Sequence, residues 1–250
     1  MRNIKLLIEY DGSRYDGWVE AKTGGHGKNG SVSGKITEVL KQMENRDTEL
    51  TGAIRTEAGV HAYRQVAAFK TETEMTPLEI KRYLNRYLPR DIAVLEASLA
   101  DERFHPAFNA KGFTFEYHIT VGDVPSVFDR KYNYYYFKNP DVEKMKKAAS
   151  IFLGKHDFAG FSDNKRMKKS TVREITGFDI YKSGNEISFT ITGDDFWPNM
   201  VRIIIALLLE IGTGEKEASV IDKIFETGDR SLAPEAIDSK GLFLTEVHYE

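Results

Sequence analysis

Apolar and polar positions in the first hundred residues follow two periods, about 2 residues for strands and about 3.6 for helices. Four apolar residues spaced i, i+3, i+4 and i+7 predict an amphipathic helix at 36–43. A second helical stripe begins at Pro77, a residue suited to the first helical turn, and stops before Pro89. Alternating apolar stretches bounded by turn residues predict strands at 3–10, 65–71 and 92–97.

The second half repeats this succession of strand and helix patterns. Helical spacing predicts helices at 142–153, 200–211 and 220–226, and Gly212 is expected to follow the second helix as its C′ residue. The pair Gly184-Asn185 suits the turn of a hairpin. The strands expected in this half are 113–121, 132–137, 173–182, 186–192 and 242–249.

Strands and helices mix without a strict strand–helix–strand alternation, which predicts an α+β fold with two similarly built mixed halves. The length of 250 residues also favours two domains over one, given roughly 150 residues per domain. The boundary is expected near Ala100–His105. The predicted domains are therefore residues 1–103 and 104–250.

Composition excludes several classes of protein. The chain has no Cys, which rules out disulfides, cysteine nucleophiles and thiolate metal sites. Its N-terminus lacks the apolar segment of a signal peptide, and the aliphatic run Ile203–Leu209 is far shorter than the about 20 residues of a membrane helix. We therefore expect a soluble, cytoplasmic protein that makes no membrane contact.

The net charge of −3, from 35 basic and 38 acidic residues, argues mildly against a dedicated nucleic-acid-binding domain. The distribution of charge matters more, because counterion release depends on the bases that line a groove. Two basic clusters stand out, and each can be either a solvated face or part of an RNA groove. They consist of Lys81, Arg82, Arg86 and Arg90, and of Lys165, Arg166, Lys168, Lys169 and Arg173.

The segment Gly52–Ala62, GAIRTEAGVHA, holds the densest group of reactive side chains. Glu57 can act as a general base or a nucleophile, and Arg55 can contact an anion or a base. The alternative is a solvated loop in which both residues are incidental. Glu57 and His61 have the i, i+4 spacing of a metal pair, but no third ligand accompanies them, so no metal is predicted.

Within this segment, RTEAGVHA resembles the RTDAGVHA signature of the TruA-type tRNA pseudouridine synthases. Eight further segments resemble motifs of that family, in the family's order and along nearly the whole chain. They are Tyr10-Asp11-Gly12 with Gly17-Trp18, Ser31–Gly34, Leu84-Asn85 with Leu88–Ile92, Phe104-His105 with Ala110 and Tyr117, Gly154–Phe158, Val172-Arg173, Met200–Arg202, and Gly241–Leu244.

The resemblance implies a ferredoxin-like pseudouridine synthase fold, with antiparallel sheets and a central RNA-binding cleft, in a homodimer. It implies isomerisation of uridines 38–40 in the anticodon stem-loop of tRNA, with no metal and no nucleotide cofactor. Glu57 stands where the family has its catalytic Asp, Phe115 where a Tyr stacks on uracil, and Arg202 where an Arg pairs with the carboxylate. The RNA contacts expected from the resemblance and the basic clusters are Arg55, which would displace the target base, and His61, His105, Lys165, Arg166, Lys168, Lys169 and Arg173.

Several positions depart from the family pattern. Glu57 is one methylene longer than Asp, Phe115 lacks the hydroxyl of Tyr, Ala107 replaces an arginine, and Ile54 replaces a glycine. Three hypotheses follow from these departures. The chain is an active tRNA pseudouridine synthase that uses Glu57, a non-catalytic RNA-binding paralogue, or a synthase that acts on a different RNA.

Overall fold

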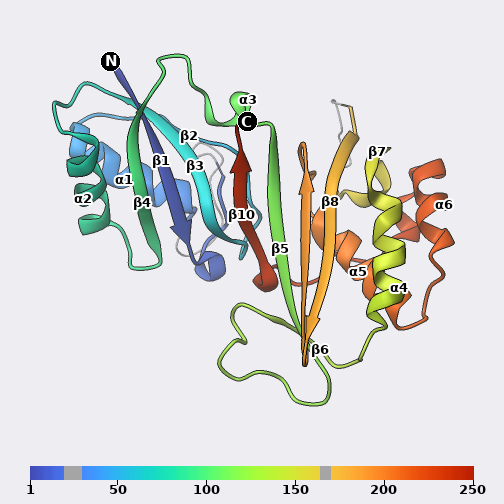
Figure 1. The fold of residues 1–250 in the computed structure, drawn as a ribbon. Helices are drawn as coiled ribbons and strands as arrows, with labels where there is room; N and C mark the ends of the chain where they lie inside the picture. The colour runs from blue at the N-terminus through green and yellow to red at the C-terminus, as the bar shows by residue number, and fades with distance from the viewer. Residues whose placement is uncertain (20–29, 164–169) are drawn as a thin grey trace. The chain divides into compact units, whose positions relative to one another are not determined.

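A computed structural model describes residues 1–19, 30–163 and 170–250 of the chain. The chain forms two compact units, the first from Met1–Lys111 together with Phe243–Glu250 and the second from Gly112–Leu242. Each unit contains a mostly antiparallel sheet accompanied by helices (Figure 1). The prediction of a mixed α and β fold with antiparallel sheets is therefore confirmed.

In the first unit the strand order is β4-β1-β3-β10, and β2 also pairs with β3. The edge of β3 that faces away from β1 is shared, because β10 pairs with its beginning and β2 with its end. The strands are β1 (Arg2–Tyr10), β2 (Leu50–Gly52), β3 (His61–Thr71), β4 (Ile92–Ala100) and β10 (Leu242–His248). The helices are α1 (Val32–Glu44), α2 (Pro77–Tyr87) and the short α3 (Pro106–Asn109).

Local signals explain where these helices begin and end. Ser31 caps α1 by accepting from Gly34 N–H, and Asn45 ends the helix in the left-handed region. Thr76 and Glu79 form a capping box at the start of α2, which the Pro77 prediction had located correctly. The predicted apolar stripes are buried only in part, through Ile36, Val39 and Leu40 of α1 and through Ile80 and Leu84 of α2, whereas Tyr87 at the end of the α2 stripe is exposed. Helices α1 and α2 lie next to each other (Figure 1).

In the second unit the strand order is β5-β9-β8-β7, all antiparallel, and β6 pairs with β5 in parallel. The strands are β5 (Gly112–Val121), β6 (Tyr134–Tyr136), β7 (Gly154–Asp157), β8 (Val172–Ser183) and β9 (Glu186–Gly193). The helices are α4 (Val142–Ala149), α5 (Met200–Gly212) and α6 (Ser219–Thr227). Short 3₁₀ turns cover Gly12–Arg14 in the first unit and Ser150–Phe152, Ala159–Phe161, Arg230–Leu232 and Ser239–Gly241 in the second.

Helix α5 is the core of the second unit, and nearly all of its residues are buried. The prediction that Gly212 lies beyond the helix is wrong, because α5 continues through it and the left-handed glycine is Gly214. Gly212 serves packing instead, since a Cβ there would lie 2.8 Å from both Met145 Cγ and Pro140 Cβ. None of the helices in the described ranges is long and apolar enough to cross a membrane.

The division between the units differs from the predicted boundary at residues 103 and 104. Residues 104–111 remain with the first unit, where Asn3 Nδ2 donates to Phe104 O (2.9 Å) and Tyr249 Oη donates to Pro106 O (3.0 Å). Strand β10 also returns to this unit and pairs in parallel with the start of β3. A hydrophobic pattern identifies a strand but not its partner, so this return could not be read from the sequence.

Candidate active site

The loop between β2 and β3, residues 53–60, carries the candidate carboxylate. Its first residues are tied to β3. Ala53 N–H donates to Val66 O (2.8 Å), and the buried Gln65 side chain donates to Ile54 O (2.9 Å). The loop therefore leaves the sheet from a fixed position.

Thr56 anchors the middle of this loop and is itself buried. Trp18 N–H donates to Thr56 O (3.1 Å) and lies 3.0 Å from Thr56 Oγ1, to which it also donates. The same hydroxyl shares a hydrogen bond of 2.8 Å with the buried phenol of Tyr10. Because buried polar groups are costly when unpaired, these three residues hold one another in place. Glu57 follows directly from this fixed backbone.

Gly17 allows the chain to pass directly against the backbone of Glu57. Its φ is +82°, and a Cβ there would lie 2.1 Å from Thr56 O and 2.4 Å from Glu57 O. Gly12 makes a similar approach to the other end of the loop, where a Cβ would lie 1.9 Å from Val60 O. Only glycine permits such close contact between two backbones.

Asp91, in the turn between α2 and β4, fixes the segment that contains Gly17. Its carboxylate accepts hydrogen bonds from the Tyr15 hydroxyl (2.6 Å) and Arg14 Nε (3.0 Å), and Tyr15 O accepts from Gly59 N–H (3.2 Å). Burial opposes ionisation of Asp91, but the hydrogen bonds from Tyr15 and Arg14 outweigh it and hold the pKa of this carboxyl below its ordinary value. We call residues 11–18, residues 53–60 and Asp91 together the Glu57 bracket.

The bracket presents Arg55 and Glu57 at its surface. Arg55 is exposed and Glu57 is half-buried, whereas Thr56 between them is buried. Glu57 O accepts from Val60 N–H (3.2 Å), which closes a tight turn. Burial raises the pKa of the Tyr10 phenol, and the negative charge of Glu57 adds to that rise. The carboxylate is thus partly shielded from water and within electrostatic reach of a buried phenol.

In the second unit, Arg202 lies in the first turn of α5. Its Nη1 donates to Ile237 O (2.7 Å) and its Nη2 to Asn199 Oδ1. Arg202 Nε is buried and has no hydrogen-bond partner within the described part of the chain. A buried donor without a partner is unfavourable, so this guanidinium keeps one N–H that the unit does not use.

Asn199 connects Arg202 to an acidic residue of the same unit. It adopts the left-handed conformation (φ +65°), which Asn tolerates better than most residues, and precedes α5 as its N-cap. Its Nδ2 donates to Asp163 Oδ2 (2.7 Å), while Arg230 Nε donates to Asp163 Oδ1 (2.8 Å). The side chain of Arg202 is therefore oriented through a chain of hydrogen bonds rather than by packing alone.

Phe115 and Tyr117 both lie on β5 and are buried in the second unit. The Phe115 ring meets Phe196 edge to face, with 5.2 Å between ring centroids. Tyr117 has no exposed surface, and its hydroxyl donates to Asp238 O (2.5 Å). Burial raises the pKa of the Tyr117 phenol, so it remains a neutral hydrogen-bond donor.

Comparison with known proteins then assigns the chain to a family. A family model described as tRNA pseudouridine synthase matches residues 6–109 and 148–250. The chain is 43% identical over 249 residues to tRNA pseudouridine synthase A of Bacillus sp. (strain KSM-64). It is 37% identical over 249 residues to tRNA pseudouridine synthase A 2 of Bacillus cereus (strain ATCC 10987 / NRS 248) and 38% identical over 249 residues to the protein of that name from Clostridium perfringens (strain 13 / Type A). All three matches cover 100% of both chains.

The chain belongs to the tRNA pseudouridine synthase family. The predicted family is therefore confirmed, and with it the class of enzyme, an isomerase that acts on RNA. The ranges matched by the family model contain the whole Glu57 bracket and Arg202. Phe115 lies outside them, in the interval 110–147 that the model does not match.

The structure gives the two histidines that we predicted as RNA contacts clear local roles in this synthase. His61 is only 1% exposed, its Nδ1 accepts from Gly12 N–H (3.1 Å), and its ring stacks on Phe243 at 4.6 Å. It is a buried residue of β3 that binds Gly12 of the bracket, so we do not include it in the proposed RNA surface. His105 caps α3 by accepting from Phe108 N–H, and the two rings stack at 4.0 Å.

Of the basic side chains predicted as RNA contacts in the second cluster, only Arg173 lies within the described residues. The others, outside the described residues, are Lys165, Arg166, Lys168 and Lys169. Arg173 is largely buried, pairs with Asp195 (3.1 Å) and lies over the Trp197 ring, 4.5 Å from its centroid. Burial raises the pKa of the Asp195 carboxyl despite the nearby guanidinium. Arg173 is thus engaged mainly within its own unit.

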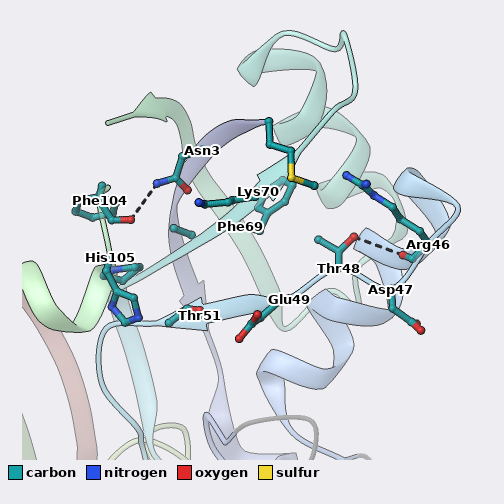
Figure 2. Close-up of a pocket in the computed structure, with 13 residues that line it drawn as sticks. Asn3, Arg46, Asp47, Thr48, Glu49, Thr51, Phe69, Lys70, Phe104 and His105 are labelled. Atoms are coloured by element: carbon teal, nitrogen blue, oxygen red, sulfur yellow. Dashed lines mark hydrogen bonds between the residues drawn. The ribbon is translucent and has the colours of Figure 1, made fainter. Parts of the chain in front are cut away.

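The first unit also has a pocket of about 430 Å³ that is distinct from the bracket (Figure 2). Phe69, Lys70 and His105 line it, along with groups of both charge signs such as Arg46 and Glu49. Phe69 is eight residues along β3 from His61, so the pocket lies about 25 Å from the start of that strand. Among the described residues no three side chains gather as a metal site, here or elsewhere.

The sequence did not identify the residues that hold the candidate carboxylate. Asp91, Tyr15 and Gly17 lie in or beside segments that resemble family motifs, yet no role was assigned to them. The only feature of the sequence that points to Asn199 is its position directly before Met200–Arg202. Their contribution depends on contacts between distant residues, such as the 76 positions that separate Tyr15 from Asp91.

Proposed function

We propose that this chain isomerises uridine to pseudouridine in the anticodon arm of tRNA, at positions 38–40, with Glu57 as the catalytic carboxylate. The observation that carries the proposal is the Glu57 bracket. Two backbone segments and Asp91 hold the residues on either side of Glu57, so its carboxylate begins from a defined point. Such preorganisation is what a single catalytic group requires.

The reaction needs one carboxylate and no redox partner. The bond from N1 of uracil to C1′ of the ribose breaks, the detached base turns, and C5 bonds to C1′. C5 loses its proton and N1 gains one, so atoms and electrons balance within the nucleotide. Glu57 would act either as nucleophile at C1′ or as the base that assists this exchange.

We assign Arg55, Arg202 and Phe115 supporting roles in the same reaction. Arg55 would fill the space left by the target base, which its exposure supports, because extrusion of a base requires compensation for lost stacking. Arg202 would be the cation that keeps the carboxylate ionised, and its unused buried Nε–H supports a missing partner. Phe115 would offer a ring face to uracil, since stacking needs no hydroxyl.

The longer side chain of Glu57 favours a second candidate, a paralogue that binds RNA without turnover. Glu places its carboxylate roughly 1 Å or more from the Asp position, and a misplacement of that size can reduce a rate about a hundredfold. A third candidate, a synthase for another RNA, makes the same bonds on a different substrate.

For this chain we propose the cytoplasm as the compartment and a homodimer as the assembly. Light scattering would test the homodimer, which should have twice the 28.4 kDa mass of the chain.

The test is release of tritium from an unmodified tRNA transcript labelled at C5 of uridine. The parent chain is compared with Glu57→Asp, Glu57→Gln and Glu57→Ala, and with Glu74→Ala as a matched change of an exposed glutamate in the same unit. We expect release by the parent and by Glu74→Ala, and a loss of at least about 100-fold in the Gln and Ala variants. Site mapping of the product would then identify the modified uridines.

Other outcomes discriminate between the candidates. Equal rates for the parent and Glu57→Ala would overturn the role of Glu57. Release by Glu57→Asp alone would mean that the scaffold binds RNA but misplaces its carboxylate. No release from any variant, on several RNAs that bind in a salt-dependent manner, would favour the non-catalytic paralogue.

A further inference from the structure

One face of α2 carries positive charge that the reaction does not use. Ile80 and Leu84 are buried, and the helical period of about 3.6 residues per turn places Arg82 and Arg86 on the opposite side of the helix. Both are exposed, as is Arg90 in the turn that follows the helix. Lys81, the remaining base of this cluster, is turned away, because its ammonium donates to Leu95 O.

Within the described ranges, Arg82, Arg86 and Arg90 have no ion-pair partner, in contrast to several cations of the first unit that do. Arg14, Lys35 and Lys41 each have a carboxylate within 4 Å, but among the described residues none lies that close to Arg82, Arg86 or Arg90. Glu79, the acid of α2, accepts hydrogen bonds from Thr76 N–H (2.7 Å) and Thr76 Oγ1 (2.8 Å) and attracts Arg82 only from beyond ion-pair distance. Like charges at i, i+4 destabilise a helix, so a bound anion would relieve the repulsion between Arg82 and Arg86.

Two tyrosines lie beside the arginines. Tyr83 and Tyr87 form an aromatic pair with 4.7 Å between centroids, and the Arg86 guanidinium lies 5.8 Å from the centroid of the Tyr87 ring. Tyr87 is half exposed. Guanidinium groups bind phosphate through paired hydrogen bonds, and exposed aromatic rings stack on bases. This combination fits RNA better than an acidic protein surface, which offers carboxylates but no bases to stack.

The basic face also leads to the catalytic loop within the same unit. Arg90 is followed directly by Asp91, whose carboxylate holds Tyr15 and Arg14 of the Glu57 bracket. An RNA strand held by α2 and its following turn would therefore be tethered beside the segment that positions Glu57. Counterion release by such contacts contributes affinity without sequence preference.

We propose that Arg82, Arg86 and Arg90, with Tyr83 and Tyr87, form a second RNA-binding surface that contacts the phosphate backbone of the substrate outside the catalytic loop. The proposal depends on the proposed function in one respect, which is that the bound RNA is tRNA. We call these five residues the α2 basic face. Its role is affinity and placement of the RNA, not the chemical step.

The test measures equilibrium binding of a fluorescent, unmodified tRNA transcript at several salt concentrations. The variant R82Q/R86Q/R90Q is compared with the parent and with K35Q/K41Q/K146Q, which removes three cations that do have carboxylate partners. Both triples change the net charge equally. Thermal melting of each variant confirms that the substitutions leave the fold intact.

We expect the arginine triple to weaken binding and to flatten the dependence of log K on log salt. The slope should fall by about 0.7–0.9 for each phosphate that is no longer neutralised, hence by about 2 to 3 in total for three arginines. In the tritium assay the arginine triple should raise KM more than it lowers kcat. The lysine triple should retain the parent slope and KM. Equal binding by the parent and the arginine triple would overturn the proposal, and so would equal weakening by both triples.

The binding experiment tests the α2 basic face independently of the proposed function, because binding is measured without turnover. RNA binding that depends on the α2 basic face, in a parent that forms no pseudouridine, would overturn only the proposed function. Turnover by the parent with a salt slope that the arginine triple leaves unchanged would overturn only the α2 basic face. In that case the three arginines would serve a partner other than RNA.

Discussion

The Tyr15 hydroxyl donates a 2.6 Å hydrogen bond to Asp91 Oδ1, and through this bond a turn after α2 controls the loop that carries Glu57. Tyr15 is buried and touches that loop through its backbone oxygen, which accepts from Gly59 N–H. Neither residue is expected to touch substrate. Tyr15 and Asp91 matter because they fix the position of the loop that carries the Glu57 carboxylate.

Removing either partner of this hydrogen bond should slow the reaction by displacing Glu57. We expect Tyr15→Phe and Asp91→Asn each to lower kcat by about tenfold or more, with a smaller effect on KM. Because both substitutions break one interaction, the double variant should be little slower than the worse single variant. Single-turnover rates measure this coupling, with Asp47→Asn as a control at an exposed ion pair; additive losses would mean that the two residues act separately.

The lowered pKa of Asp91 also predicts a pH dependence of stability. Ionised Asp91 favours the folded state, so its contribution is fully present above the ordinary Asp pKa of 3.8 and is lost as the pH falls through the lower folded-state pKa. The difference in free energy of unfolding between the parent and Asp91→Asn should therefore be constant near neutral pH and shrink below about pH 4. Urea unfolding at pH 7, 5, 4 and 3 tests this, and a difference that persists unchanged to pH 3 would contradict it.

Gly17→Ala should damage the site more than a comparable glycine substitution elsewhere. Its Cβ would collide with the backbone oxygens of Thr56 and Glu57, in addition to the strain of a positive φ. We expect a loss of about 100-fold in kcat. Gly184→Ala is the control, because it has the same left-handed conformation (φ +60°) but no described atom within 4 Å of its Cβ, so it should cost only about 1–2 kcal/mol of stability and leave kcat unchanged.

Asn199→Gly separates the backbone role of Asn199 from its hydrogen bonds. Glycine keeps the left-handed φ, but the links from Arg202 and to Asp163 are removed. We expect kcat to fall by about tenfold or more if Arg202 acts in catalysis. Asn45→Gly, at the left-handed C-cap of α1, is a matched control that should keep the parent rate. Unchanged turnover in Asn199→Gly would show that Arg202 does not need this orientation.

Local patterns predicted most of the secondary structure, and the failures have physical reasons. The capping signal at Pro77 located α2, because capping depends on residues that are adjacent in sequence. Strand β3 begins at His61, four residues before the predicted strand. Residues 61–64 are two buried positions followed by two exposed ones, so they lack the alternation of a half-buried strand.

The candidate site was predictable only in part. Glu57 and Arg55 were found because their chemistry is concentrated in one short segment. The burial of His61 could not be foreseen, since it depends on Gly12 and on Phe243, which is 182 positions away in the chain. The α2 arginines were visible as a cluster, but only the structure distinguishes Lys81, which is bonded to β4, from the three that face outward.

Strand β10 imposes an order of assembly on a growing chain. A ribosome can complete Gly112–Leu242 while residues 243–250 are still unmade, but the sheet beside the Glu57 bracket lacks its β10 neighbour until they emerge. The half of the protein that is synthesised first is therefore finished last, by a contact of very large sequence separation. In a nascent chain, the first unit would complete the edge of its sheet at His61 and Ala62 only after residues 243–250 had emerged.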